Sequence, residues 1–183
     1  MGYYREAYYY DDVYERYENY HKHYTESPYY SLWIKCLEYI REDAKILEVG
    51  CGTGQLLKML QDKKRYLKSY TGFDFSQKAI ELCKSGLVVQ GDARNPKMYI
   101  GDYDLIISME VIEHLIDDVE VIRLWPTGKE VLITVPDFDD PAHLRYFQTE
   151  EEIIKRYQID FYCLYIKSIV KYERWFIINA ITI

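Results

Sequence analysis

Residues 45–54 read KILEVGCGTG, an apolar run of β-forming residues followed by three glycines at alternate positions. The run predicts a short strand over 45–49, and the glycines predict a tight turn into a helix. A glycine-rich turn between a first strand and a first helix is where an open α/β sheet binds nucleotides, because the amides at the start of the helix are unpaired. A glycine turn that serves only packing is the alternative.

The sequence on both sides of this turn alternates between strand and helix patterns. Further strands are predicted at 70–73, 87–90, 102–109 and 130–135. Helices are predicted around 32–40, directly after the glycine turn, after Ser76, at 119–125 and at 150–157. Two long β-rich runs, 161–172 and 174–183, end the chain, and the tight turn between them requires antiparallel pairing. The pattern predicts one α/β domain over residues 1–183, built on a mostly parallel sheet.

The composition is that of an ordinary globular protein, with 49% apolar and 29% charged residues among 183. No stretch reaches the roughly 18 apolar residues of a membrane span, and the N-terminus lacks the apolar core of a secretory signal. The four cysteines form no CxxC pair, which favours reduced thiols over disulfides or a zinc site. We therefore expect a cytoplasmic protein without a membrane partner. The net charge of −7 and the lack of a basic stripe disfavour a nucleic-acid partner.

Tyrosine is unusually frequent at the start of the chain. Eleven of the 21 tyrosines lie within residues 1–30. Tyr10, Tyr14, Tyr17 and Tyr24 follow one another at helical spacings, with charged residues between them, so an amphipathic helix with an aromatic face is predicted. This helical segment either packs on the domain or forms a lid over a ligand site.

Two carboxylates follow the strands that are predicted to come after the glycine turn. Asp74 ends the strand at 70–73, where a carboxylate can accept hydrogen bonds from both ribose hydroxyls of an adenosine. Asp92 follows the strand at 87–90 and suits an adenine amino group. These features fit both NAD and S-adenosylmethionine. Gln55 stands where a dinucleotide fingerprint has its third glycine, and the final hairpin departs from a dinucleotide fold, so an NAD-dependent enzyme is disfavoured.

Four segments resemble, in the expected order, the motifs of class I S-adenosylmethionine-dependent methyltransferases. They are ILEVGCGTGQLL (46–57), GFDFSQKAIELCK (72–84), GDA (91–93) and DLIISMEVIEHL (104–115). VLITVP (131–136) resembles the fifth strand of that family, and the terminal hairpin its sixth and seventh. The resemblance covers about residues 30–183. It implies a Rossmann-like three-layer sandwich with a seven-stranded sheet in the order 3-2-1-4-5-7-6, in which strand 7 is antiparallel.

The resemblance also implies a set of cofactor-binding residues for S-adenosylmethionine. The methionine part would lie among Glu48 and the glycine turn, the ribose on Asp74, and the adenine between Phe75 and the GDA segment. Cys51 is expected to serve packing and not to act as a nucleophile. The full implied set is Glu48, Gly50, Cys51, Gly52, Thr53, Gly54, Asp74, Phe75, Asp92, Ala93, Glu110 and Val111.

A carboxylate–histidine cluster follows the strand predicted at 102–109. In a helix, Glu110, Glu113 and His114 would share one face, and His143 could join them. The pattern resembles that of metal-dependent small-RNA 2′-O-methyltransferases and ubiquinone-pathway O-methyltransferases, in which a divalent metal would lower the pKa of a substrate oxygen. We expect no metal here, and we expect His114 or His143 to act as a metal-free general base beside Glu113.

The expected function is methyl transfer from S-adenosylmethionine to an O, N or C nucleophile of a small molecule, by in-line displacement. Two alternatives remain at this point. One is a non-catalytic S-adenosylmethionine-binding partner of another subunit, since a cofactor pocket does not establish catalysis. The other is a metal-dependent O-methyltransferase that uses the cluster of Glu110, Glu113 and His114.

Overall fold

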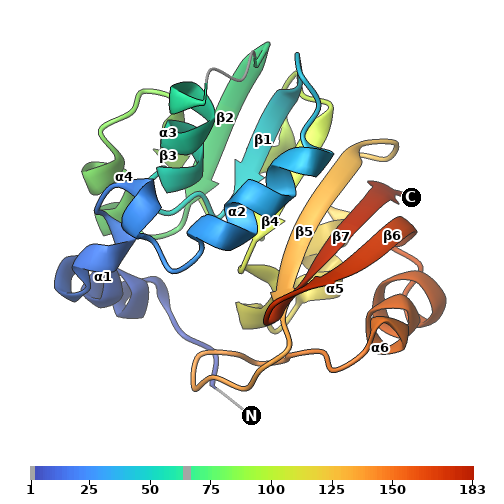
Figure 1. Cartoon of the computed structure of the whole chain (residues 1–183). Coiled ribbons are helices and arrows are strands. Elements are labelled where there is room, and N and C mark those ends of the chain that lie inside the picture. The colour runs from blue at the N-terminus through green and yellow to red at the C-terminus, as the bar shows by residue number, and fades with distance from the viewer. Residues whose placement is uncertain (1–2, 64–66) are drawn as a thin grey trace. The chain divides into compact units, whose positions relative to one another are not determined.

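The computed structural model describes residues 3–63 and 67–183 (Figure 1). The chain forms two compact units, one of residues Glu6–Asp104 and one of Leu105–Ile183 with the described part of the first five residues. The sequence-predicted elements are present in both units, with boundaries that shift by a few residues.

In the unit Glu6–Asp104, three parallel strands pair side by side: β1 (Lys45–Val49), β2 (Ser69–Asp74) and β3 (Val88–Gln90). Its α-helices are α1 (Ala7–Arg16), α2 (Tyr30–Cys36), α3 (Gln55–Asp62) and α4 (Gln77–Cys83). Short 3-10 turns at Glu18–Tyr20, Tyr24–Glu26, Leu37–Tyr39 and Pro96–Tyr99 complete the unit. The apolar residues of β1 and the inward face of α3 are buried, as their patterns predict.

The start of each of the two helices α3 and α4 follows from a local signal. Gly54 precedes α3 in a left-handed conformation, with φ +76°, which glycine adopts without strain. A Cβ atom there would also lie 2.5 Å from Cys83 Sγ. Ser76 caps α4 by accepting a hydrogen bond from Ala79 N, which confirms the predicted cap.

The helix predicted from the tyrosine spacing is shorter than expected. It covers Ala7–Arg16 and includes Tyr10 and Tyr14, but Tyr17 has an extended backbone and is 59% exposed. Tyr24 lies on a separate 3-10 turn. The expectation of one continuous aromatic face was therefore wrong beyond Arg16. The physical reason is that carbonyl groups after Arg16 accept hydrogen bonds from the side chains of Thr53 and Gln55, instead of continuing the helical ladder.

The unit that begins at Leu105 has four strands: β4 (Leu105–Met109), β5 (Glu130–Pro136), β6 (Leu164–Tyr172) and β7 (Trp175–Thr182). β4 and β5 are parallel, whereas β7 is antiparallel to β5 and to β6 (Figure 1). A 3-10 turn at Ile112–His114 follows β4, and α5 (Asp118–Arg123) precedes β5. α6 (Glu150–Ile154) continues into a π-helical turn, Lys155–Asp160.

The strand order is β3-β2-β1-β4-β5-β7-β6 in a seven-stranded sheet. This order and the antiparallel β7 confirm the Rossmann-like fold that the sequence resemblance implied. Among the described residues, no helix is long and apolar enough to cross a membrane.

A buried carboxylate joins separate segments of the unit that begins at Leu105. Asp118, with no exposed side-chain surface, accepts two hydrogen bonds from Arg156, at 2.8 Å and 2.6 Å, and one of 2.8 Å from the Tyr157 hydroxyl. Arg145 approaches the same carboxylate, with Nη1 3.4 Å from Oδ2. The Arg145 guanidinium also donates to the backbone carbonyls of Ile112 and Leu115. Asp118 thereby ties the start of α5 to the turn after β4 and to the segment after α6.

We expect Asp118→Ala to lower the free energy of unfolding by about 3–5 kcal/mol, because it leaves two guanidinium groups without their buried carboxylate. Urea denaturation followed by circular dichroism measures this change. Glu120→Ala, at an exposed position of the same helix, is the matched control and should change stability by less than about 0.5 kcal/mol. A loss for Asp118→Ala as small as that of the control would show that the network does not stabilise the fold.

Candidate cofactor and catalytic sites

The glycine turn after β1 adopts a backbone that side chains would strain. Gly50, Gly52 and Gly54 have φ values of +70°, +51° and +76°. The turn bends back onto β2, since the amides of Gly50 and Cys51 both donate to the carbonyl of Phe73, at 2.8 Å and 3.0 Å. The turn thus lies at the carboxyl ends of β1 and β2, where open α/β sheets bind their ligands.

Asp74 joins this turn to the start of α4. Its carboxylate is buried, with 6% of the residue exposed. One oxygen accepts a hydrogen bond from Gly52 N at 2.9 Å, and the other accepts one from Ser76 N at 2.9 Å. Burial raises the pKa of Asp74 to about 6, although these two amides act in the opposite direction. The structure therefore brings Asp74 and Gly52 together, as the cofactor assignment requires.

Glu48 is the predicted cofactor-binding carboxylate on β1, and it is as buried as Asp74. It accepts a hydrogen bond from the Tyr70 hydroxyl on the neighbouring strand β2. Burial raises the pKa of Glu48 to about 8, so its carboxyl group is mostly protonated at neutral pH. A neutral carboxyl can donate a hydrogen bond as well as accept one.

Cys51 and Thr53 have different surroundings within the turn. The Cys51 thiol is buried, and this burial raises its pKa far above the ordinary range of a thiol. A thiol that stays protonated is a poor nucleophile, which supports the packing role expected for it. Thr53 donates a hydrogen bond to the carbonyl of Tyr20, in the N-terminal segment.

The residues assigned to the adenine lie in the same unit. Phe75 is half-buried, and its ring centroid is 5.2 Å from that of Tyr10 in a tilted arrangement. Asp92 is exposed and accepts a hydrogen bond from Arg94 N at 2.8 Å. Ala93 is buried, and its carbonyl accepts a hydrogen bond from the Tyr99 hydroxyl at 2.7 Å.

Two residues of α1 belong to these surroundings, and sequence reasoning did not assign them to the site. The Asp11 carboxylate accepts hydrogen bonds from the Ser76 hydroxyl, at 2.6 Å, and from Lys78 N, at 3.1 Å, at the start of α4. Tyr14 lies against Gly52: a Cβ atom on Gly52 would be 2.9 Å from the Tyr14 hydroxyl oxygen. The spacing of Tyr10 and Tyr14 was the only sequence signal for this contact.

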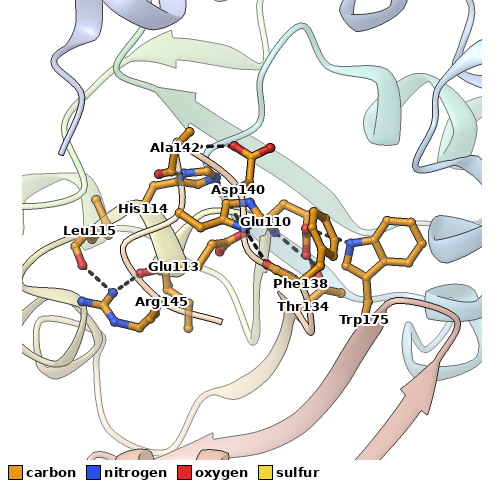
Figure 2. A network of polar contacts seen from close by, with 12 residues as sticks. Glu110, Glu113, His114, Leu115, Thr134, Phe138, Asp140, Ala142, Arg145 and Trp175 are labelled. Atoms are coloured by element: carbon orange, nitrogen blue, oxygen red, sulfur yellow. Dashed lines mark hydrogen bonds and ion pairs between the residues drawn. The ribbon is translucent and has the colours of Figure 1, made fainter. Parts of the chain in front are cut away.

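Glu110 and Val111 belong to the other unit, directly after β4. Glu110 is not helical, since its φ is +56°, and the expectation that it shares a helix face with Glu113 and His114 was wrong. Its carboxylate accepts hydrogen bonds from the Thr134 hydroxyl, at 3.0 Å, and from Trp175 Nε1, at 2.8 Å (Figure 2). Because these two partners lie on β5 and β7, the Glu110 side chain does not share a helix face with Glu113 and His114. Burial raises the pKa of Glu110 to about 7.

Glu113, His114 and His143 do come together. Their possible ligand atoms all lie within 4.8 Å of one another. Glu113 is fully buried, and neither of its carboxylate oxygens has a hydrogen-bond partner in another described residue. His114 Nε2 lies 3.7 Å from one of these oxygens.

Backbone carbonyls orient both histidine rings. His114 Nδ1 is 2.8 Å from the carbonyl oxygen of Ala142 (Figure 2), and His143 Nδ1 is 3.2 Å from that of Phe138. A carbonyl only accepts, so in neutral histidine each Nδ1 carries the proton and each Nε2 carries the lone pair. Burial lowers the pKa of His114 to about 4, and burial and the charge of Glu110 raise the pKa of Glu113 well above its ordinary value. The Nε2 lone pairs of the two histidines can therefore bind a cation or accept a proton, although burial makes His114 a weak base.

Comparisons with known proteins bear on the family and on the fold. A family model described as a methyltransferase domain matches residues 21–160. Among solved structures, the PH0226 protein from Pyrococcus horikoshii OT3 is similar at a TM-score of 0.69 and 16% identity, over 94% of this chain and 99% of that one. A SAM-dependent methyltransferase from Aquifex aeolicus is similar at a TM-score of 0.63 and 16% identity, over 82% and 89% of the two chains.

A SAM-dependent methyltransferase from Archaeoglobus fulgidus is similar at a TM-score of 0.61 and 15% identity, over 90% of this chain and 97% of that one. At these identities the solved structures support the fold, and the family model supports the family. A search of curated proteins found no significant match. The chain therefore belongs to the methyltransferase domain family, as a class I S-adenosylmethionine-dependent methyltransferase.

Proposed function

We propose that this methyltransferase transfers the methyl group of S-adenosylmethionine to a nucleophilic O, N or C atom of a small molecule. The contact between the Gly52 amide and the buried Asp74 carboxylate is the observation that supports S-adenosylmethionine as the methyl donor. It joins the left-handed glycine turn to a carboxylate at the end of the next strand. Such an arrangement suits a ligand with a ribose, and membership of the methyltransferase family favours S-adenosylmethionine as that ligand.

The cofactor would lie across the residues already assigned from the sequence. The glycine turn and Glu48 would surround the methionine part, Asp74 would bind the ribose hydroxyls, and Phe75, Asp92 and Ala93 would border the adenine. Glu110 and Val111 would lie near the sulfonium. The whole chain would act as one methyltransferase domain, with the N-terminal segment to residue 30 as a lid.

The net charge of the chain supports a small molecule, and not a nucleic acid, as the methyl acceptor. A net charge of −7 repels the phosphates of a nucleic acid, which usually bind through a basic surface. Methyl transfer needs alignment of donor and acceptor more than it needs bond activation, and such positioning is worth about 7–11 kcal/mol in favourable cases. Where the acceptor is protonated, the Nε2 lone pair of His114 or His143 would take the proton.

Replacement of Asp74 tests the cofactor site. We expect Asp74→Ala to weaken S-adenosylmethionine binding by about 1.5–3 kcal/mol, since a charged acceptor of ribose hydroxyls is lost. Isothermal titration measures the affinity, and Asp102→Ala, at a residue whose side chain is 85% exposed, is the matched control. Unchanged affinity in folded Asp74→Ala would refute the ribose assignment.

A metal-dependent reaction is the second candidate, and one observation favours it. The carboxylate of Glu113 is buried without a hydrogen-bond partner in another described residue, and it lies among histidines whose Nδ1 atoms contact backbone carbonyls. Metal-binding histidines are commonly oriented in this way. Glu113, His114 and His143 would hold a divalent ion, which would lower the pKa of an acceptor hydroxyl. Glu110 does not belong to this set, because its carboxylate is directed to Thr134 and Trp175 and the ligand atoms that converge are those of Glu113, His114 and His143.

Chelation separates the two candidates. If His114 or His143 is a metal-free base, EDTA should leave methyl transfer unchanged, whereas a metal-dependent reaction should stop and should resume with magnesium or manganese. The assay incubates the enzyme with labelled S-adenosylmethionine and a metabolite pool, and mass spectrometry detects methylated products. Glu113→Gln is informative in the same assay: it should mimic chelation only if the carboxylate binds the ion. S-adenosylmethionine affinity should remain unchanged in every arm.

A further inference from the structure

Two groups of contacts hold the N-terminal segment against the proposed cofactor site. At one end, Asp11 accepts hydrogen bonds from Ser76 and Lys78 at the start of α4, beside α1 (Figure 1). At the other end, Gln55 Nε2 donates to the carbonyls of Asn19 and Lys22, at 3.2 Å and 2.8 Å. The first group of contacts holds α1 next to the turn that follows Asp74. The second group holds residues 19–22 next to the glycine turn.

Tyr14 lies between these two groups of contacts. Its hydroxyl oxygen is the atom nearest to the position that a Gly52 side chain would occupy. Its ring packs edge-on against Tyr20, with centroids 5.7 Å apart. The hydroxyl forms no hydrogen bond with another described residue. Tyr14 is half-buried, and its hydroxyl is not among the buried polar atoms that lack a partner in the described residues. An acceptor on a ligand would therefore replace a hydrogen bond to water at this hydroxyl.

The chemistry of the hydroxyl defines what it can bind. Burial and the negative charge of Asp74 raise the pKa of Tyr14 well above its ordinary value. The phenol therefore stays protonated and is available as a hydrogen-bond donor. Within the described residues, Asp74 accepts hydrogen bonds from the Gly52 and Ser76 amides and not from Tyr14, so the Tyr14 hydroxyl can serve a different acceptor.

We propose that Tyr14 binds the cofactor: its hydroxyl donates a hydrogen bond to the carboxylate in the methionine part of S-adenosylmethionine. This inference rests on the proposed cofactor site. The glycine turn is assigned to the methionine part, and the Tyr14 hydroxyl faces that turn at Gly52. The methionine carboxylate is the group of this part that only accepts hydrogen bonds. The lid would thus contribute a specific contact and not merely cover the site.

Two ligands that differ in the methionine part test this role. S-adenosylhomocysteine carries the amino-acid carboxylate, whereas 5′-methylthioadenosine keeps the adenosine and lacks it. We expect Tyr14→Phe to weaken binding of S-adenosylhomocysteine about tenfold or more, as expected for loss of a hydrogen bond to a charged group. Binding of 5′-methylthioadenosine should be unchanged. Tyr17→Phe, at an exposed tyrosine just beyond α1, is the matched control and should bind both ligands as the wild type does.

The outcomes separate this inference from the proposed function. Normal S-adenosylhomocysteine binding by Tyr14→Phe would overturn the role of Tyr14 and leave the cofactor site intact. An equal loss for both ligands would also overturn it, since it would indicate a general packing role. If the wild type bound neither ligand, the proposed function and this inference would both fail. Thermal unfolding of each variant checks that it is folded as stably as the wild type.

Discussion

The Asp74 carboxylate is the constraint on which the unit Glu6–Asp104 depends. One oxygen holds the Gly52 amide and the other holds the Ser76 amide, so a single side chain fixes the turn after β1 and the turn after β2. Both turns lie at the carboxyl ends of parallel strands, where ligands of such sheets bind. Burial raises the pKa of Asp74 to about 6, so this carboxylate is ionised less readily than an exposed one. A ligand that offers hydroxyl donors would favour the ionised form.

The second unit uses a buried carboxylate in a comparable way. Asp118 binds Arg145 and Arg156, and Arg145 in turn binds the backbone of the turn that carries Glu113 and His114. Leu144 N donates to the carbonyl of Glu113 at 3.0 Å, which ties the segment containing His143 to the same turn. A rigid support of this kind is what a catalytic or metal-binding cluster requires, because misplacement of reacting groups lowers the rate steeply. The two buried carboxylates of this unit thus have distinct roles. Asp118 accepts hydrogen bonds that stabilise the unit, whereas Glu113 has no hydrogen-bond partner in another described residue and belongs to the candidate site.

The two glutamates of the Glu-x-x-Glu-His segment also differ in their roles. Spacing alone suggested that Glu110 and Glu113 act together. Glu110 has a positive φ, and its carboxylate accepts hydrogen bonds from Thr134 on β5 and Trp175 on β7. Glu113 keeps its oxygens without a partner in another described residue and beside His114. Only one of the two carboxylates is therefore available for chemistry in this cluster.

The sequence by itself determined the strands, most helices, the Ser76 cap and the strand order that the family motifs imply. The strands, the helices and the cap depend on the periodicity and conformational preferences of neighbouring residues, whereas the strand order is implied only by the resemblance to the family. Only the tertiary structure decided the end of α1 at Arg16, the contact of Tyr14 with Gly52, and the separation of Glu110 from Glu113. Each depends on partners that lie 24 or more residues away, such as Thr134 for Glu110. No local pattern specifies which distant donor will meet a given carbonyl or carboxylate, because packing of the whole unit selects that partner.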